Sequence, residues 1–150
     1  MQQDIPLIMA IKIQSQTDDF DLLWEDGMPI SEYRRKLVVD CIEMSDFYNV
    51  SEDDKKFIAD AAYALCDALG ENNTIQSFAV FFEEDDKIAE IITDCGPRRL
   101  SVEVSTSKEL FYQFHRILRL EIGQGITKSS WSLPPYDFNN DVAWLLEGAA

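Results

Sequence analysis

One segment constrains the fold more than any other, because residue type specifies its start, its apolar face and its end. Ser51 and the three acids after it place a capping hydroxyl and negative charge where a helix begins and its dipole is positive. Gly70 follows the segment as a C-terminal cap. Apolar residues recur between them at helical spacing: Ile58, Ala61, Ala62, Leu65 and Leu69. We predict an amphipathic helix over 51–69, which needs a second surface to bury its stripe.

Two further segments have helical patterns. Ser31 is a plausible N-cap for a helix over 32–46, in which Leu37, Val38, Cys41 and Ile42 recur at helical spacing. Thr106 and Glu109 have the spacing of a capping box, which predicts a helix over 107–121. Its expected stripe is Leu110, Phe111, Phe114, Ile117 and Leu118, with Gly123 and Gly125 ending it.

Strand patterns occupy the chain between these helices and at its start. Residues 77–82 and 88–93 are rich in aromatic and β-branched side chains, and from Leu100 to Ser105 apolar and polar residues alternate. We therefore expect a three-stranded meander over 77–105. A single helix over 78–92 is the alternative, but it would bury Asp85. Residues 5–13 have the period of a half-buried strand. Pro6 either confines that strand to the edge of a sheet or is the residue at which the strand begins.

These elements predict an α+β fold: an antiparallel sheet of about four strands, the N-terminal strand plus the meander, with three main helices on one face. We expect an irregular tail over 128–140, because Pro134 and Pro135 forbid helix there, and then a short helix capped by Asp141. No composition shift divides residues 1–150, so one acidic globular domain is expected. Met9 is a second plausible start, which would make residues 1–8 dispensable.

The cysteines and the N-terminus bear on location. Cys41, Cys66 and Cys95 are odd in number and lack CxxC spacing, so buried free thiols in a reducing compartment are expected. The N-terminus lacks the basic start of a signal peptide, and its apolar run is too short to span a membrane. A cytoplasmic protein is the consistent expectation.

Catalytic motifs are sparse. His115 is the only histidine, and we interpret it as a partly exposed helical residue. No nucleophile elbow and no phosphate-binding glycine loop occurs. The acidic runs 83–86 and 137–141 lack the glycine and the bidentate glutamate of an EF-hand. We therefore predict no enzyme activity, no cofactor and no metal site, and rank a carboxylate- or Mg²⁺-dependent enzyme third.

Net charge is the strongest functional signal. The chain has 28 acidic residues against 13 Lys and Arg, a formal net charge of −15. Direct nucleic-acid binding is disfavoured because this field repels phosphate. The compact basic groups 34–36 and 98–99 are expected to pair with neighbouring acids.

The acids gather in blocks, and aromatic and apolar residues stand among the acids of the first block, a mixture typical of protein interfaces. The residues predicted to bind a partner are Asp18, Asp19, Asp21, Trp24, Glu25, Asp26, Glu83, Glu84, Asp85 and Asp86. The tail offers a second mixture in Trp131, Leu133, Tyr136, Asp137 and Phe138, anchors if exposed and core if buried.

Complementary charge accelerates association with a basic partner. The favoured hypothesis is an immunity-type inhibitor that masks a basic toxin, such as a nuclease, or another nucleic-acid-binding protein. The alternative is a soluble bacterial or phage adaptor or assembly protein whose acidity serves solubility. The sequence leaves the oligomeric state open.

Overall fold

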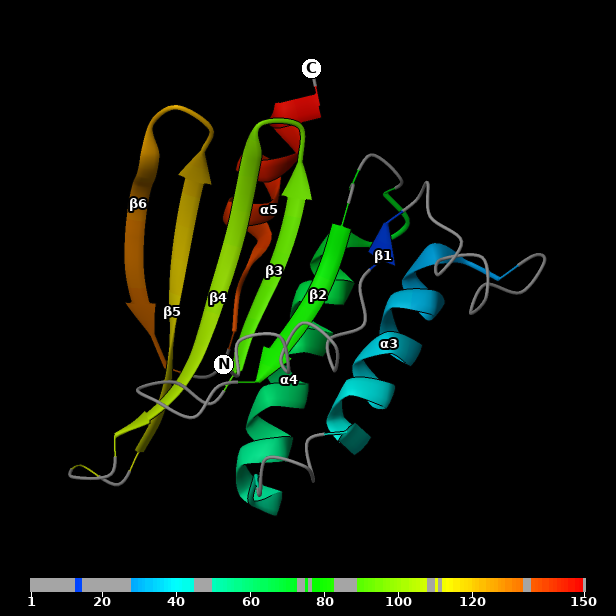
Figure 1. Cartoon of the computed structure of the whole chain (residues 1–150), viewed down its shortest axis with the longest axis vertical. Coiled ribbons are helices and arrows are strands. Elements are labelled where there is room, and N and C mark those ends of the chain that lie inside the picture. Colours follow the sequence, from blue (N-terminus) through cyan, green and yellow to red (C-terminus); the bar gives the residue numbers. More distant parts are fainter. Residues whose placement is uncertain are drawn as a thin grey trace, which may run out of the picture.

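The computed structural model describes residues 13–14, 28–44, 50–72, 75, 77–82, 89–107, 110, 112–133 and 136–149. These residues form an α+β fold in which three helices lie on one face of an antiparallel sheet (Figure 1). The sheet has the strand order β1-β2-β3-β4-β5-β6, so every strand lies beside its neighbours in the chain. The α+β class is confirmed, but the sheet has more strands than the expected four.

Two helices form an antiparallel pair behind the first strands (Figure 1). α3 (Ile30–Met44) and α4 (Glu52–Leu69) correspond to the two segments predicted from apolar spacing, but α3 begins before Ser31, which therefore lies inside the helix and is not its N-cap. The Ser51 side chain accepts a hydrogen bond from the Asp54 backbone N–H at 3.1 Å, as expected of an N-cap. Gly70 ends α4 with a positive φ of 59°. The α4 stripe is buried from Phe57 to Leu69.

The predicted meander is present and continues into two more strands. Its strands are β2 (Ser77–Phe82), β3 (Ala89–Cys95) and β4 (Arg98–Ser107). The added strands are β5 (Tyr112–Glu121) and β6 (Gly125–Ser132). Within the described part of the N-terminal region, β1 (Ile13–Gln14) pairs with β2, and the rest of the predicted strand over 5–13 lies outside the described residues.

The core lies between the sheet and the helices. Ile91, Val102 and Ile117 face one another across β3, β4 and β5, and all three are buried. The helices cover them with Leu37 and Val38 from α3 and the apolar stripe of α4. Each fully buried aliphatic side chain of this kind contributes about 1.5–3 kcal/mol to stability. The core therefore holds the helical layer on a single face.

The predicted helix over 107–121 is wrong. Residues 112–121 are β5, paired along their length with β4 from Arg98↔Glu121 to Ser107↔Tyr112. Gly123 and Gly125, expected to end the helix, form the β5–β6 turn with φ values of 87° and 75°. The spacing of apolar residues resembles that of a helix because β5 buries residues on both of its faces. Ile117 is buried toward the helices and Leu118 is buried on the opposite face.

The irregular tail is also a strand for part of its length. Residues 125–132 form β6, whereas Pro134 and Pro135 lie outside the described residues. The predicted last helix is present as α5 (Asn139–Leu146), followed by the short 3-10 helix η2 (Glu147–Ala149). Asp141 does not cap it. The N-cap residue is Phe138, and the Asp141 carboxylate instead accepts a hydrogen bond from Arg119 at 2.8 Å.

Candidate functional site

The ten residues predicted to bind a partner all lie outside the described residues. Six belong to the block 18–26 and four to the block 83–86, which joins β2 to β3. The structure therefore leaves that prediction as it stands. The described helices and strands carry charged side chains of their own, and the candidate site lies on them.

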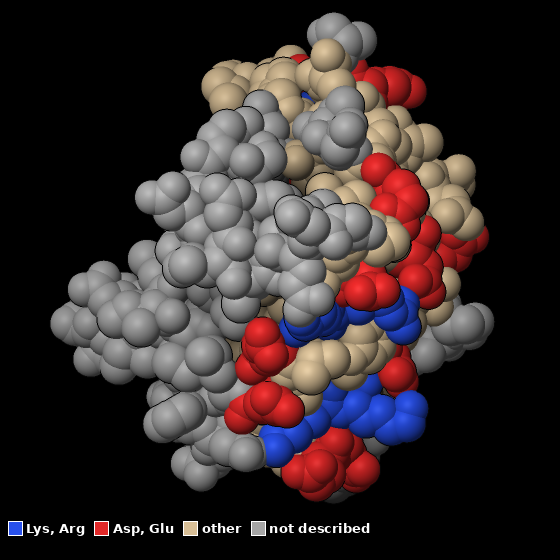
Figure 2. Space-filling view, turned by 90° about the vertical axis from the view of Figure 1, so that its right-hand side faces the viewer, with Lys and Arg blue, Asp and Glu red and all other residues tan. Residues whose placement is uncertain are grey.

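The helical layer places several acids in solvent and pairs only some of them. Ion pairs join Arg35 to Asp67 at 2.6 Å, Lys56 to Asp60 at 2.9 Å and Lys55 to Glu52 at 3.1 Å. Exposed pairs of this kind contribute little to stability, because water screens both charges. On this side of the molecule, acidic side chains lie next to the basic ones and extend beyond them (Figure 2).

Four carboxylates of α3 and α4 have neither an ion pair nor a side-chain hydrogen bond with another described residue. Glu32, Asp40 and Glu43 belong to α3, and Asp53 belongs to the first turn of α4. All but Asp40, which is half-buried, are exposed. The end of α3 and the start of α4 lie at the same end of the helix pair (Figure 1). Glu43, near the end of α3, and Asp53, in the first turn of α4, therefore add negative charge to that end.

The buried arginine of α3 belongs to the packing of this layer. Arg34 is fully buried and donates to the backbone oxygens of Gly70 at 3.0 Å and Asn72 at 2.7 Å. Those carbonyls follow the end of α4, where the helix leaves acceptors without intrahelical donors. The predicted pairing of the 34–36 group with acids is thus right for Arg35 and wrong for Arg34, which caps a helix instead.

The sheet half of the molecule has a different charge balance. Residues 89–133 contain six Lys or Arg and five Asp or Glu, so the surplus of acid lies in the rest of the chain. Across the sheet face turned away from the helices, the register places Glu90 opposite Glu103, Glu103 opposite Arg116 and Arg116 opposite Trp131. Glu103 and Arg116 are 3.7 Å apart, and Glu90 accepts a hydrogen bond from Ser101.

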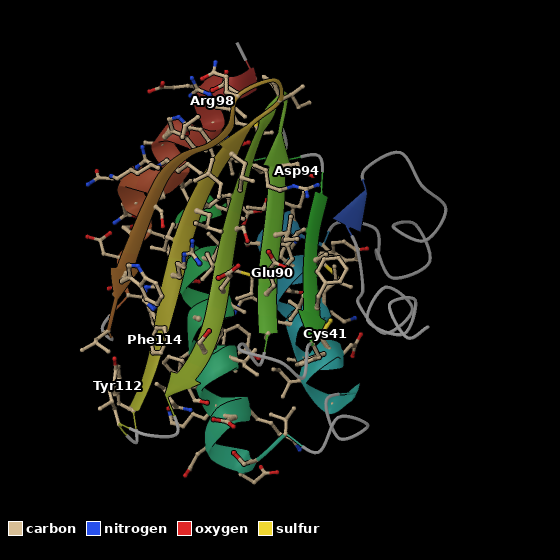
Figure 3. All side chains as sticks on the ribbon, turned by 60° about the vertical axis from the view of Figure 1, so that its left-hand side comes forward. Cys41, Glu90, Asp94, Arg98, Tyr112 and Phe114 are labelled. Carbon is tan, nitrogen blue, oxygen red and sulfur yellow. The ribbon has the colours of Figure 1, made fainter. Side chains whose placement is uncertain are left out.

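Aromatic side chains cluster at one end of this face. Tyr112 and Phe114 lie near the start of β5, away from Asp94 on β3 (Figure 3). Their ring centroids are 5.5 Å apart, and Phe114 lies 5.2 Å from Trp131 on β6. The guanidinium of Arg116 is 5.4 Å from the centroid of the Trp131 ring. Tyr112 and Phe114 were missed as surface residues because their segment was interpreted as a helix.

The tail mixture is divided between surface and core. Trp131 is 63% exposed and Leu133 55% exposed, whereas Phe138 is buried and Tyr136 is half-buried. Trp131 and Leu133 therefore meet the condition for surface anchors, and Phe138 belongs to the core. The signal that could have found this division is the Gly123-Gln124-Gly125 run, which is typical of a turn between two strands.

His115 is not the partly exposed residue that was expected. It is 1% exposed on β5, with its ring centroid 4.5 Å from Tyr136 and 5.6 Å from Phe138. Neither ring nitrogen has a hydrogen-bond partner among the described residues. Burial lowers the pKa of His115 to about 4, against the opposing effect of Asp141, and burial raises the pKa of Tyr136. The imidazole is thus neutral at pH 7 and packs as a core aromatic ring.

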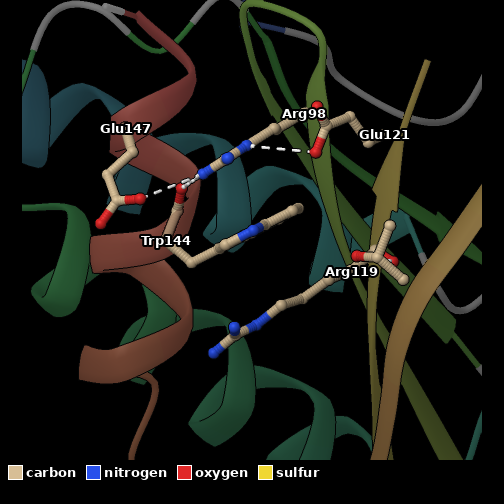
Figure 4. A network of polar contacts seen from close by, with 6 residues as sticks. Arg98, Arg119, Glu121, Trp144 and Glu147 are labelled. Carbon is tan, nitrogen blue, oxygen red and sulfur yellow. Dashed lines mark hydrogen bonds and ion pairs between the residues drawn. The ribbon is translucent and has the colours of Figure 1, made fainter. Parts of the chain in front are cut away.

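Two basic side chains attach α5 to the sheet. The Trp144 ring lies between Arg98 and Arg119, whose guanidinium carbons are 4.8 Å and 5.3 Å from its centroid (Figure 4). Arg98 also donates to the Trp144 backbone oxygen at 2.6 Å and lies 3.4 Å from both Glu121 and Glu147. Arg99 pairs with Asp94 at 2.7 Å. The predicted pairing of Arg98 and Arg99 with acids is confirmed.

Thiols and carboxylates are the remaining groups that could be reactive or bind a metal. All three cysteines are buried thiols outside any disulfide, as expected, and burial raises the pKa of Cys66 to about 12. In the described ranges, no three His, Cys, Asp or Glu side chains lie close enough together to hold a metal ion. Asp137 accepts a hydrogen bond from the Asn139 backbone N–H at 3.0 Å, which is a local turn contact.

Comparisons with known proteins give no family model, no curated protein and no solved structure that matches this chain. Among the helices that the structure describes, none has both the length and the apolar character needed to cross a bilayer. The charge and geometry of the described residues are therefore what indicates a function.

Proposed function

We propose that this protein acts by binding and not by catalysis, as a cytoplasmic inhibitor of the immunity type. Its partner would be a basic toxin, such as a nuclease, or another basic nucleic-acid-binding protein, whose positive surface it covers. The observation that supports this proposal is the outward anionic surface of α3 and of the start of α4. Glu32, Glu43 and Asp53 are exposed there without a cationic partner among the described residues, in a chain of net charge −15.

The electric field of a carboxylate reaches into solution only when no cation lies beside it. An acid that pairs with a neighbouring Lys or Arg contributes little field beyond its own surface, whereas an unpaired exposed acid attracts cations in solution. A protein that binds nucleic acid presents Lys and Arg at the spacing of phosphates. Carboxylates on a rigid helix can occupy the positions of those phosphates, and the opposite fields accelerate the encounter.

The blocks 18–26 and 83–86 would add to the same attraction. We propose that Asp18, Asp19, Asp21, Glu25 and Asp26 act together with the four acids of 83–86, and that Trp24 serves as an apolar anchor beside them. Aromatic anchors dominate the affinity of protein interfaces, and surrounding charge mainly sets the association rate. Loss of the anchor should therefore increase the dissociation rate, whereas loss of the acids should slow association.

Affinity capture from the native host tests this function. The bait is the full chain, loaded at low salt and eluted with a salt gradient, and bound proteins are identified by mass spectrometry. The test variant is E32Q/E43Q, and the matched control is D137N/E147Q, which removes the same charge from exposed positions near α5. We expect a basic protein on the wild-type and control baits, and roughly threefold less of it on the test variant.

Two results would contradict the proposal. The first is that no basic protein is retained at low salt, which would favour an adaptor whose acidity serves solubility. The second is equal retention by all three baits, which would show that the α3 surface does not contribute.

A further inference from the structure

β6 is an edge strand that lacks most of the features that keep edges from pairing. It forms the outer strand beside β5, and in the described part of the chain no other strand pairs with it (Figure 1). Most of its side chains are exposed. Natural edge strands are usually protected from pairing because they contain several charges or a proline, or because they are very short. β6 has eight residues and contains Lys128 as its single charge and no proline.

Charge identifies the occupant of this edge. In a chain of net charge −15, residues 122–136 contain no Asp or Glu and one Lys. Two copies of the protein repel each other when their acidic surfaces approach, because like charges at short range cost free energy. The repulsion is weakest where both copies present β6. We propose that the protein forms a two-fold symmetric homodimer in which the β6 strands of two copies pair in antiparallel fashion and join the sheets.

The register of such a pairing is compatible with the side chains of β6. In an antiparallel ladder, residues directly opposite each other lie on the same face of the sheet, so the two-fold axis passes through one residue position. Axes at Ser129, Ser130 or Trp131 never place Lys128 opposite Lys128 of the second copy. An isologous contact of this kind closes on itself and leaves no further edge of the same type.

Exposed apolar side chains along β6 add apolar contacts to the backbone hydrogen bonds of this pairing. Trp131 is 63% exposed, and it is held in place by Phe114 and Arg116. Ile126 is 54% exposed on the same face as Trp131, since their partners on β5 are Leu120 and Arg116. Rigid aromatic anchors at the centre of an interface contribute most of its affinity. The contact is small, so we expect a dissociation constant of about 1–100 µM.

Sedimentation equilibrium of the purified full chain over a range of concentrations tests the dimer. The variant W131E places a carboxylate at the pairing edge, and A143E adds the same charge at an exposed position of α5 as the matched control. We expect wild type and A143E to dimerise equally and W131E to dimerise at least about tenfold more weakly. Thermal unfolding of each variant shows whether its fold is intact.

Cross-linking locates the contact independently of its affinity. Because the three native cysteines are buried, S129C adds an accessible thiol at an exposed position of β6. A short bismaleimide should join two S129C chains, and it should not join two A143C chains. A monomer at every concentration, a dimer unaffected by W131E, or S129C that cross-links only to a foreign protein in host lysate would overturn the proposal. The last result would identify β6 as a docking edge for a foreign strand.

Discussion

Burial of His115 determines how this single residue responds to acid. In the folded chain its ring packs against Tyr136 and Phe138, and its nitrogens have no hydrogen-bond partner among the described residues. Protonation would place a charge in that apolar environment, so the folded state favours the neutral ring. The unfolded chain has no such preference. The two states therefore bind different numbers of protons over part of the acid range.

Acid therefore destabilises the folded state through His115. The pKa of His115 falls from 6.5 in the unfolded chain to about 4 in the fold, so the unfolded state binds more protons between those values. The contribution of His115 to stability is complete above pH 6.5 and is lost as the pH falls toward about 4. We expect a loss of about 2–3 kcal/mol from this residue over that range.

Urea unfolding at a series of pH values measures the effect, with His115→Phe as the comparison. The phenyl ring keeps the aromatic packing and cannot be protonated, so the variant should lose less stability than wild type between about pH 7 and pH 4. At neutral pH the substitution should be nearly neutral, because it removes a buried polar group without a partner. Parallel stability curves for the two proteins would show that His115 does not titrate as described.

At the scale of elements, α5 is attached to the sheet by one aromatic ring between two arginines. Trp144 contacts Arg98 and Arg119, and both arginines also pair with carboxylates. Because the ring is half-buried and flanked by cations, its removal takes away apolar contact and two cation–π interactions together. The chain turns closely beside this contact, where a Cβ on Gly96 would overlap the Gly148 carbonyl.

The two tryptophans of the C-terminal region should therefore differ in their effect on stability. We expect Trp144→Ala to lower the free energy of unfolding by about 2–4 kcal/mol. Trp131→Ala removes a largely exposed ring and should cost less than about 1 kcal/mol in the monomer. Chemical denaturation at low protein concentration measures both. Equal losses, or a larger loss for Trp131, would contradict the role assigned to the α5 contact.

Elements with one clear period were predictable from sequence. α4 has a cap, a single apolar stripe and a terminal glycine, and all three are found in the structure. β2 matches its predicted range, and β3 and β4 lie close to theirs but extend further. β2 and β3 are rich in β-branched or aromatic residues, β4 alternates apolar and polar residues, and the turn Gly96-Pro97 separates β3 from β4. The local pattern and the tertiary environment agree in these segments.

β5 and β6 could not be predicted in the same way, for two physical reasons. β5 buries side chains on both faces, so the alternation that identifies a half-buried strand is missing and the remaining apolar spacing resembles a helix. β6 is exposed on nearly every residue, so it has no hydrophobic period at all. Its pairing with β5 stabilises it as a strand. Those two strands were missed, and with them the aromatic cluster of Tyr112, Phe114 and Trp131.

At the scale of the whole molecule, charge is distributed unevenly between two regions. Residues 89–133 have nearly balanced charge, and the surplus acid lies on the helical layer and in the blocks 18–26 and 83–86. A homodimer through β6 would leave the helical layer of each copy accessible to a basic partner. The two proposals are thus compatible, and they use different surfaces and different residues. Failure of one would leave the other in place.

The acidic blocks should control the rate of binding more than the fold. We expect reversal to Lys of Glu83, Glu84 and Asp85 together, or of Asp18, Asp19 and Asp21 together, to slow association with the captured basic partner. Steering by charge changes association rates by about 10- to 1,000-fold at low salt, so a decrease of roughly tenfold is expected for each triple variant. Circular dichroism and thermal unfolding check that each variant keeps its fold.

Stopped-flow association with the captured partner, measured over a range of ionic strengths, decides whether the excess acid has this role. The wild-type rate constant should fall steeply as salt rises, and both triple variants should show lower rates at low salt and a shallower dependence. At high salt, the association rate constants of all three proteins should become equal. A wild-type rate that does not change with salt, or triple variants that associate as fast as wild type, would show that binding does not depend on this charge.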